Sequence, residues 1–507
     1  MSAILRSCRV VLYTKRVVLR NRLLFLNSGS FNALQAKSVK ETFGLAQSRN
    51  YVPTSSEYTR LTPNQVNSIL KLNEVSLEVH QGAVYEVELN QLASNNPVED
   101  RLTEAKLPSP GTFLFGVFDG HAGSACAQAI SERLFHYLAV FLTSSEVLEP
   151  YANQLKKGQS LDEVKPELLQ IFGKEVGNNV ESMNIVYKNS LAKLITEMGG
   201  TVDDEVSVEE SLTSAFMRLD QDLITEALPS TTNTQLNKEM LEVAFSGACA
   251  CVAYVNGADL HVANVGDCKA VLGVNLGGDE WRATELTKDH TANNENEVQR
   301  LITSHPNEST SLIIAGRLLG QLIPLRAFGD VRYKWSVKDL KHIEKTSDTD
   351  AKFYTYYRDN FIPPHYRTPP YLTAEPEISH HRLTPKDKFL ILASDGLWEM
   401  LSPDKVVKLV AAHLDGEQVL EEFSPPENLA LREINELLKK RKQSLANRTI
   451  DSNVATHLLR NALGPDHAKL SALLSLPSNL VRNYRDDISV SVIFFDTEYL
   501  REHPSYE

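Results

Sequence analysis

Buried strands that end in an acidic residue recur in this chain and constrain its fold more than any other feature. The clearest is Phe113–Gly123, where an apolar run stops at Asp119-Gly120-His121. Lys388–Ala393 is a second apolar run, and Ser394-Asp395-Gly396 follows it directly. Alone, Asp119 is equally well explained as the cap of a helix that begins near Gly123. The recurrence favours a different interpretation, in which several strand ends aim carboxylates at one place.

Other segments repeat the pattern. Asp259–Val274 is predicted to form two strands joined by a tight turn at Gly266-Asp267. Asp486-Asp487 stands directly before the apolar run Ile488–Phe495, and Glu99-Asp100 precedes the first motif. No matching set of Cys or His ligands accompanies these acids. Carboxylates suit hard cations such as Mg²⁺ or Mn²⁺, and a carboxylate cluster without cations repels itself, so the pattern predicts a metal site.

The order of these motifs resembles that of the metal-dependent protein serine/threonine phosphatases of the 2C type. The resemblance runs from about Glu99 to Phe495, and longer intervals such as residues 95–101 and 370–377 resemble the mitochondrial pyruvate dehydrogenase phosphatases of that family. The residues alone leave α+β and α/β open. The resemblance implies an α+β fold, a four-layer α-β-β-α sandwich of two antiparallel sheets flanked by helices. The motifs that carry it are E-D (99–100), F-D-G-H-A-G (118–123), A-N-V-G-D (263–267), F-G-D (328–330), S-D-G-L-W-E (394–399) and R-D-D-I (485–488).

The resemblance also implies two Mg²⁺ or Mn²⁺ ions, with a third, weaker site, and a role for individual residues. Asp119 would bridge the two ions, Gly120 would offer its backbone carbonyl, and His121 would protonate the leaving serine oxygen. The remaining acids are expected as metal ligands or as groups that support the ligands. Asp100, Asp395 and Asp486 would complete the binuclear site, Asp267 matches the third site, and Glu99, Asp487 and Glu399 would be further or supporting ligands.

Two positions depart from the family pattern. Many members carry an arginine that grips the substrate phosphate four residues before the glutamate of the E-D pair, and this chain has Asn95 there. An amide can donate hydrogen bonds to phosphate, but it carries no charge. Glu399 stands where other members often have aspartate, and its extra methylene puts direct metal ligation in doubt.

The N-terminal segment has the composition of a mitochondrial transit peptide. Residues 1–50 contain many Lys and Arg, interleaved with Val, Leu and Ser, and Glu41 is their one acid. A basic surface helix or a nucleic-acid arm is the alternative. The whole chain has a net charge of −13, which argues against nucleic-acid binding. No long apolar run predicts a membrane span, and the five cysteines are expected as reduced, buried thiols.

We therefore expect a transit peptide over residues 1–50 and one catalytic domain over 51–500, with insertions at about 143–241, 331–375 and 415–482. The first insertion is predicted to be helical, including 161–172, and the second to form an ordered flap near the site. The third is expected to carry a docking surface, and its tip lies at about 447–466. The metal candidates run from Glu99 to Asp487, so one site must gather residues from both ends of the chain.

The expected function is hydrolysis of phosphoserine on the E1α component of pyruvate dehydrogenase in the mitochondrial matrix, which would reactivate that component. The resemblance further implies docking on the lipoyl domain of dihydrolipoyl acetyltransferase and a regulatory subunit. Two alternatives stay open: a matrix phosphatase of the same family with another target, or a catalytically weak scaffold with the same fold. The presence of Asp119, His121 and Asp395 argues against the scaffold.

Overall fold

The computed structural model describes residues 60–172, 184–200, 206–228, 237–346, 356–357, 360–418, 431–446 and 450–504. By its internal contacts the chain divides into two units, Met1–Asn50 and Tyr51–Glu507. The predicted transit peptide lies outside the described residues and stays a prediction. Everything below concerns the second unit.

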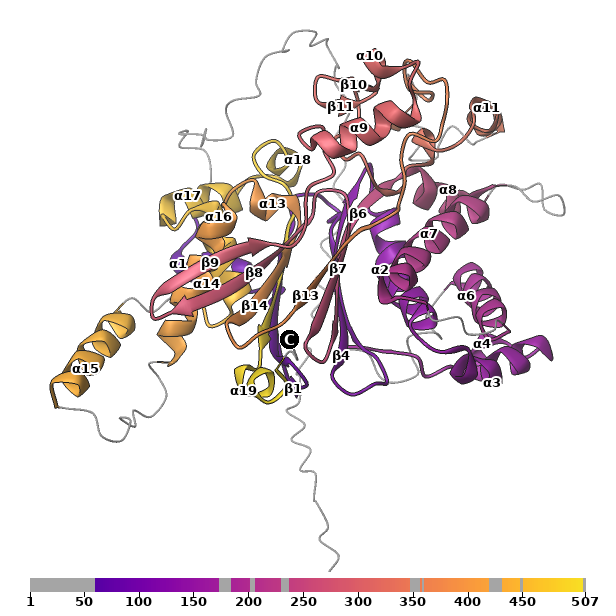
Figure 1. Cartoon of the computed structure of the whole chain (residues 1–507). Coiled ribbons are helices and arrows are strands. Elements are labelled where there is room, and N and C mark those ends of the chain that lie inside the picture. The colour runs from indigo at the N-terminus through magenta and orange to yellow at the C-terminus, as the bar shows by residue number, and fades with distance from the viewer. Residues whose placement is uncertain are drawn as a thin grey trace, which may run out of the picture. The chain divides into compact units, whose positions relative to one another are not determined.

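Two antiparallel sheets form the centre of this unit (Figure 1). In the first sheet the strand order is β1-β2-β15-β14-β8-β9, and in the second it is β13-β7-β6-β4-β3-β5, with β12 paired to β6. Strands from the two ends of the chain are therefore neighbours, since β2 pairs with β15. The first sheet comprises β1 (Val75–Gln81), β2 (Val84–Leu92), β15 (Ile488–Phe495), β14 (Asp387–Ala393), β8 (Lys269–Gly277) and β9 (Glu280–Glu285). The second comprises β13 (Glu377–Arg382), β7 (Asp259–Val265), β6 (Gly247–Asn256), β4 (Thr112–His121), β3 (Arg101–Lys106), β5 (Gln170–Ile171) and β12 (Phe328–Gly329).

Helices cover the outer faces of both sheets. One group lies on the side of the second sheet, where α6 packs on α2 rather than on the strands, and another lies on the side of the first sheet, where α17 packs on α1 and α16. The first group contains α2 (Ala125–Phe141), α6 (Ile185–Met198), α7 (Val208–Ala227) and α8 (Lys238–Phe245), and the second contains α1 (Pro63–Leu70), α14 (Pro403–Gln418), α16 (Val454–Leu463) and α17 (His467–Leu474). Shorter or peripheral elements are α3 (Ser145–Lys156), α4 (Leu161–Val164), α9 (Glu295–Ser304), α10 (Ser309–Leu312), β10 (Ile313–Ile314), β11 (Arg317–Leu318), η1 (Val331–Tyr333), α11 (Val337–Thr346), α13 (Asp395–Trp398), α15 (Leu431–Ala446), α18 (Ser478–Val481) and α19 (Thr497–Glu502).

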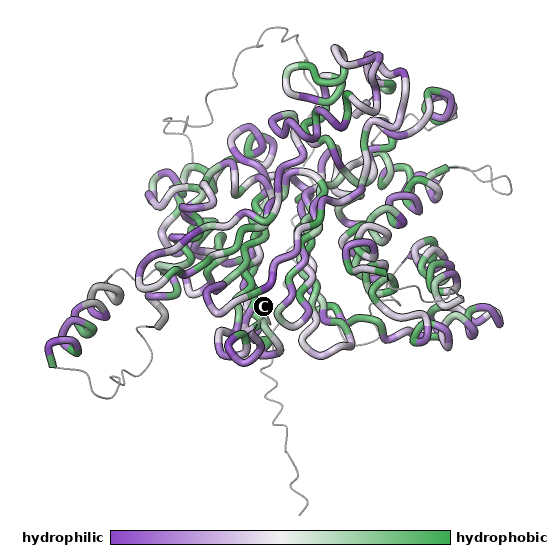
Figure 2. The backbone as a smooth tube through the Cα atoms, in the orientation of Figure 1, coloured by the Kyte–Doolittle hydropathy of each residue, from purple (hydrophilic) through white to green (hydrophobic). Residues whose placement is uncertain are grey.

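A hydrophobic core lies between each pair of adjacent layers, so the four layers enclose three cores. The alternation of side-chain direction along β4 explains how one strand contributes to two of them. Side chains of a strand point to opposite faces in turn. Phe113, Phe115 and Val117 face the core between the sheets, whereas Leu114 and Phe118 face the core under α2. Figure 2 shows the hydrophobic residues concentrated along the strands and the helices that pack on them. The predicted α+β four-layer sandwich is confirmed. Within the described residues, no helix combines the length and the apolar composition that crossing a bilayer requires.

Several local predictions are confirmed, and two are wrong. The expected helix after Gly123 is α2, and the described cysteines are free and buried. Residues 161–172 were expected as one helix, but they form the short α4 and the strand β5. The two strands expected over Asp259–Val274 are β7 and β8, and the turn at Gly266-Asp267 joins them. Because the two strands lie in different sheets, this turn crosses between layers.

The second wrong prediction concerns the tip of the last insertion. Residues 447–466 were expected to be the replaceable tip of a docking insertion, but α16 lies within them and packs against the first sheet. Val454, Ala455, Leu458 and Leu459 are fully buried there. The helix is amphipathic like a surface helix of a globular core. Replacing it would remove part of the core rather than a docking surface.

Glu104 on β3 supplies a prediction about stability. Its side chain is buried, burial raises its pKa to about 8, and Oε1 has no hydrogen-bond partner among the described residues. A carboxyl whose folded pKa is raised loses stabilisation as the pH climbs from its unfolded pKa, about 4.3, to its folded pKa. Glu104→Gln should therefore stabilise the protein increasingly between pH 5.5 and pH 8.5, by on the order of 2 kcal/mol at the upper end. Urea midpoints of both proteins at the two pH values would measure this, and a pH-independent difference would contradict it.

Candidate metal centre and active site

The carboxylate of Asp119 lies at the end of the sandwich because β4 carries it there. Asp119 continues the alternate row of Phe113, Phe115 and Val117, which faces the other sheet. It pairs with Cys249 of β6 across the ladder. The apolar row thus ends in a carboxylate at the edge of the core between the sheets, and the predicted placement at a strand end is observed.

Two more carboxylates reach the same place from other elements. β14 ends at Ala393, Ser394 caps the short helix α13, and Asp395 is the first residue of that helix. Asp100 directly precedes β3, is buried, and accepts a hydrogen bond of 2.7 Å from the Ser394 hydroxyl. Segments that are far apart in the sequence therefore meet at one end of the two sheets.

The electrostatics of this cluster favour binding of a cation. Burial raises the pKa of Asp119 well above its usual range, and Asp100, Asp395 and Asp267 raise it further. Burial and the neighbouring Asp487 raise the pKa of Asp100 to about 7. The Asp395 side chain therefore acts on Asp119 in the same direction as burial does, by favouring the neutral form of its carboxyl group. A divalent cation among these oxygens would remove the repulsion between the carboxylates.

The donor set fits Mg²⁺ or Mn²⁺, since it consists of carboxylates without thiolate or imidazole partners. Within the part of the chain that the structure describes, no three His, Cys, Asp or Glu side chains are already arranged around one metal position. The predicted ion number stays a prediction.

Gly120 sits where only glycine fits. A Cβ at this position would lie 2.6 Å from the backbone carbonyl oxygen of Glu99 and 3.0 Å from the Cβ of Ala127. Glu99 itself accepts a 2.8 Å hydrogen bond from the Gly123 amide. Burial raises the pKa of Glu99, although the Gly123 amide opposes that rise. The close approach brings the Glu99-Asp100 segment against the end of β4.

The structure distinguishes the adjacent acids Asp486 and Asp487. Asp487 is buried, and its carboxylate accepts hydrogen bonds from the Asn95 amide nitrogen (2.9 Å), the Asn95 side chain (2.9 Å) and the Glu99 amide (2.8 Å). The Asp486 carboxylate instead pairs with Arg482 and accepts from the Asp487 amide. Asp487 thus lies with the cluster, and its hydrogen bonds hold the loop that precedes β3. The Asp486 side chain, which the sequence made the stronger candidate, faces Arg482 instead.

Asn95 is also placed differently from the expectation. One of its side-chain N–H groups is committed to Asp487, so at most the other remains for a phosphate oxygen. Asp267, the third-site candidate, accepts a 3.1 Å hydrogen bond from the Cys249 thiol and lies near Asp119. Glu399 is exposed at the end of α13 and is not among the groups that most shift the pKa of Asp100 or Asp119.

His121 is the last residue of β4 and contacts the cluster from one side. Its Nε2 lies 2.6 Å from Oδ2 of Asp330. Burial lowers the pKa of the imidazole, but Asp330, Asp267 and Glu99 raise it by more, so the pKa lies above its usual value. Sequence reasoning missed this contact. The F-G-D motif at 328–330 was noted, but nothing in the sequence shows that its aspartate meets a histidine 209 residues earlier.

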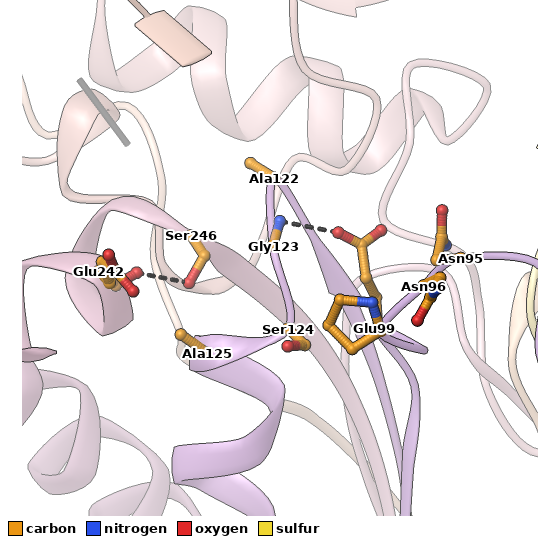
Figure 3. A pocket seen from close by; sticks show the side chains of 10 residues that line it. Asn95, Asn96, Glu99, Ala122, Gly123, Ser124, Ala125, Glu242 and Ser246 are labelled. Carbon is orange, nitrogen blue, oxygen red and sulfur yellow. Dashed lines mark hydrogen bonds between the residues drawn. The ribbon is translucent and has the colours of Figure 1, made fainter. Parts of the chain in front are cut away.

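A cavity of about 230 Å³ opens beside these groups (Figure 3). The loop before β3 forms one wall, and the start of α2 and the end of α8 form the other. Its lining is polar in part, with amide, carboxylate and hydroxyl groups, and it is large enough for a phosphorylated side chain. The lining residues are Asn95, Asn96, Pro97, Glu99, Ala122, Gly123, Ser124, Ala125, Glu242 and Ser246.

Comparison with known proteins decides the family. Residues 141–443 match the family described as "Protein phosphatase 2C". The chain is 42% identical over 478 residues, 91% of its length and 88% of the relative's, to "[Pyruvate dehydrogenase [acetyl-transferring]]-phosphatase 1, mitochondrial" of Bos taurus. The chain belongs to the protein phosphatase 2C family. This phosphatase is also 41% identical over 512 residues, 96% of the chain and 94% of the relative, to "[Pyruvate dehydrogenase [acetyl-transferring]]-phosphatase 2, mitochondrial" of Homo sapiens.

Membership confirms the predicted class, a metal-dependent phosphoprotein phosphatase. It is a hydrolase, and the family depends on Mg²⁺ or Mn²⁺, in agreement with the carboxylate cluster. The relatives' names confirm the predicted mitochondrial location. In this structure the Asp486 carboxylate is paired with Arg482.

Proposed function

We propose that this phosphatase hydrolyses phosphoserine on the E1α component of pyruvate dehydrogenase in the mitochondrial matrix, and so reactivates it. The observation that supports this most is the 42% identity over 91% of the chain to a mitochondrial phosphatase named for that substrate. A fold shared with other phosphatases would not identify the target, but similarity along almost the whole chain, insertions included, favours a shared one.

The carboxylates at the end of the sandwich are proposed to hold two Mg²⁺ or Mn²⁺ ions. Asp119, Asp100 and Asp395, with the Gly120 carbonyl, form the inner set, and Asp267 serves a third, weaker ion. Asp486 can join them only if its carboxylate leaves Arg482. That ion pair is half exposed, and exposed pairs contribute only about 0–1 kcal/mol, so a divalent cation can displace it.

When bound, the cations supply charge stabilisation for the transferring phosphoryl group and lower the pKa of the attacking water. The chain's own groups have separate tasks. The carboxylates of Asp119, Asp100, Asp395 and Asp267 place the reaction at one end of the sandwich, because each of them lies at or near the end of a strand. His121 gives a proton to the serine oxygen as the P–O bond breaks, since an alkoxide is a poor leaving group. One water is consumed, and serine and inorganic phosphate are released.

The cavity beside Glu99 is proposed to receive the phosphorylated side chain. Figure 3 shows Asn95 and Glu99 on one side and Ser124 and Ser246 on the other. The free N–H of Asn95 is proposed as a phosphate contact. Since one amide proton cannot replace an arginine, most of the phosphate charge must be met by the cations.

The proposal includes two protein partners. These are the lipoyl domain of dihydrolipoyl acetyltransferase, which would hold the phosphatase near its substrate, and a regulatory subunit. Tethering raises the effective substrate concentration without altering the chemistry. The helix α15 offers a candidate surface, because it lies apart from both sheets in Figure 1 and exposes Leu431 and Leu438.

One assay tests the target and the tether. The protein should dephosphorylate phosphorylated pyruvate dehydrogenase at least about tenfold faster than phosphorylated branched-chain dehydrogenase, a difference of about 1.4 kcal/mol. Removing Mg²⁺ with EDTA should abolish both rates. Excess free lipoyl domain should slow the reaction on the assembled complex but not on isolated E1. Equal rates on the two substrates would contradict the proposed target and favour a matrix phosphatase that acts on another protein. The absence of activity on both substrates would favour the catalytically weak scaffold.

A further inference from the structure

The contact between His121 and Asp330 is the strongest feature that the metal chemistry does not use. Oδ2 of Asp330 lies 2.6 Å from Nε2 of His121, and the Asp330 side chain is 1% exposed while that of His121 is 21% exposed. A short, buried carboxylate–imidazole contact is among the stronger hydrogen bonds in proteins. It orients one ring nitrogen and leaves the other, Nδ1, without a recorded partner among the described residues.

The backbone holds Asp330 in place for this contact. Asp330 has a φ of +48°, a left-handed conformation that most side chains avoid. Its amide donates to the Ser246 carbonyl (2.9 Å), and its carbonyl accepts from the Tyr333 amide (2.8 Å). Its second carboxylate oxygen, Oδ1, is buried without a hydrogen-bond partner in the described residues. An uncommon backbone conformation and an unsatisfied buried oxygen are both costly, which points to a function for the residue.

Gly247 makes room for the pair. It lies opposite His121 in the β4–β6 ladder, and a Cβ built on it would overlap both Nε2 of His121 and Oδ2 of Asp330. Any other residue at this position would push the two side chains apart. Three elements, β4, β6 and the segment after β12, thus combine to form one contact.

We propose that Asp330 is the positioning residue of His121, and that it holds Nε2 so that Nδ1 is presented to the leaving serine oxygen. This inference rests on the proposed role of His121 as the general acid. The carboxylate accepts the Nε2 proton, so the proton that His121 transfers is the one on Nδ1. After the transfer, the imidazole is neutral and remains bound to Asp330 through Nε2–H. Asp330 itself touches neither substrate nor metal.

The test is leaving-group dependence in the full-length protein with saturating Mg²⁺. Asp330→Asn keeps the shape of the side chain, and asparagine tolerates the left-handed conformation, so the fold should survive. The asparagine amide can turn its N–H₂ toward Nε2, which stabilises the imidazole tautomer protonated on Nδ1. Proton transfer from Nδ1 instead has to leave the tautomer protonated on Nε2. We expect a loss of kcat of about 10- to 100-fold on a phosphoserine peptide, with KM nearly unchanged. The loss on p-nitrophenyl phosphate, whose leaving group needs no proton, should stay below about 3-fold.

Three further variants control the result. Gly247→Ala leaves Asp330 charged but crowds the pair, and it should show the same selective loss. Asp220→Asn removes a neighbouring buried carboxylate that pairs with Lys334 at 2.7 Å. It should lower thermal stability and change both substrates equally. The double variant His121→Gln/Asp330→Asn should be no slower on the peptide than His121→Gln alone, because both changes remove one function.

The outcomes separate the two hypotheses. If His121→Gln is selective for the peptide and Asp330→Asn slows both substrates equally, or if the double variant is additive, Asp330 has only a structural role and this inference is wrong. If His121→Gln slows the phosphoserine peptide and p-nitrophenyl phosphate equally, His121 is not the general acid, and the positioning role of Asp330 is refuted with it. Selective loss in Asp330→Asn and Gly247→Ala with a non-additive double variant would establish the positioning role.

Discussion

Asp119→Asn should reduce turnover by at least about 10³-fold on every substrate. Three acidic side chains, those of Asp100, Asp395 and Asp267, lie close enough to Asp119 to raise its pKa. A cation at this position would therefore interact with several carboxylates. Replacing one oxygen by an amide nitrogen removes that charge and places a donor where a cation ligand is required. Initial rates on phosphoprotein and on p-nitrophenyl phosphate, over a range of Mg²⁺ concentrations, measure the effect.

The same variant has a second readout that does not depend on activity. In the metal-free protein Asp119 is a source of repulsion, so Asp119→Asn should melt at a higher temperature than the wild type in EDTA at pH 7.5. Added Mg²⁺ should stabilise the wild type and have less effect on the variant, because it binds the variant more weakly. Asp259→Asn is the matched control, since Asp259 also belongs to the second sheet but pairs with Arg382 and His380 instead. It should keep its rate within about twofold, as surface substitutions usually do. A near-normal rate for Asp119→Asn at limiting Mg²⁺ would refute the metal centre.

The strand-end carboxylates were predictable because their signal is local. An apolar run that ends in Asp119 or Asp395 is visible in the sequence, and alternation along β4 determines the face on which Asp119 lies. The helices α2 and α6 were predictable for the same reason, since each carries its own periodic pattern. The layered fold followed only from the resemblance, because strand periodicity does not show which strands pair.

The rest depends on contacts that no local pattern encodes. All residues of β15 are buried, including Ser489 and Ser491 on one face. Since both faces are buried, the pattern along the strand does not indicate which of Asp486 and Asp487 faces inward. The turn at Gly266-Asp267 looks like a hairpin, but the layer to which each strand belongs is set by distant partners. The contact of Asp330 with His121 joins residues brought together by β6, which lies between them in sequence and pairs with both β4 and β12.

His121→Gln should slow hydrolysis of a phosphoserine protein by about 10²- to 10³-fold. It should slow p-nitrophenyl phosphate hydrolysis by less than about 5-fold. Glutamine fills much of the same space and can still accept or donate a hydrogen bond, but it cannot release a proton at neutral pH. Serine leaves as an alkoxide unless it is protonated, whereas nitrophenolate leaves readily, so the two substrates separate proton donation from all other roles of the residue. Steady-state kcat and KM on both substrates at one Mg²⁺ concentration provide the comparison.

His305→Gln is the matched control for that measurement. His305 is buried, and its Nδ1 lies 2.9 Å from the Thr368 hydroxyl. It stacks on Tyr371 of the separate core around α9, away from the carboxylate cluster. Its replacement should change both rates by the same small factor, through stability alone. Equal large losses on both substrates in His121→Gln would instead mean that His121 orients the attacking water or supports the metal centre. The raised pKa of His121 would then reflect its acidic neighbours without any part in releasing the serine.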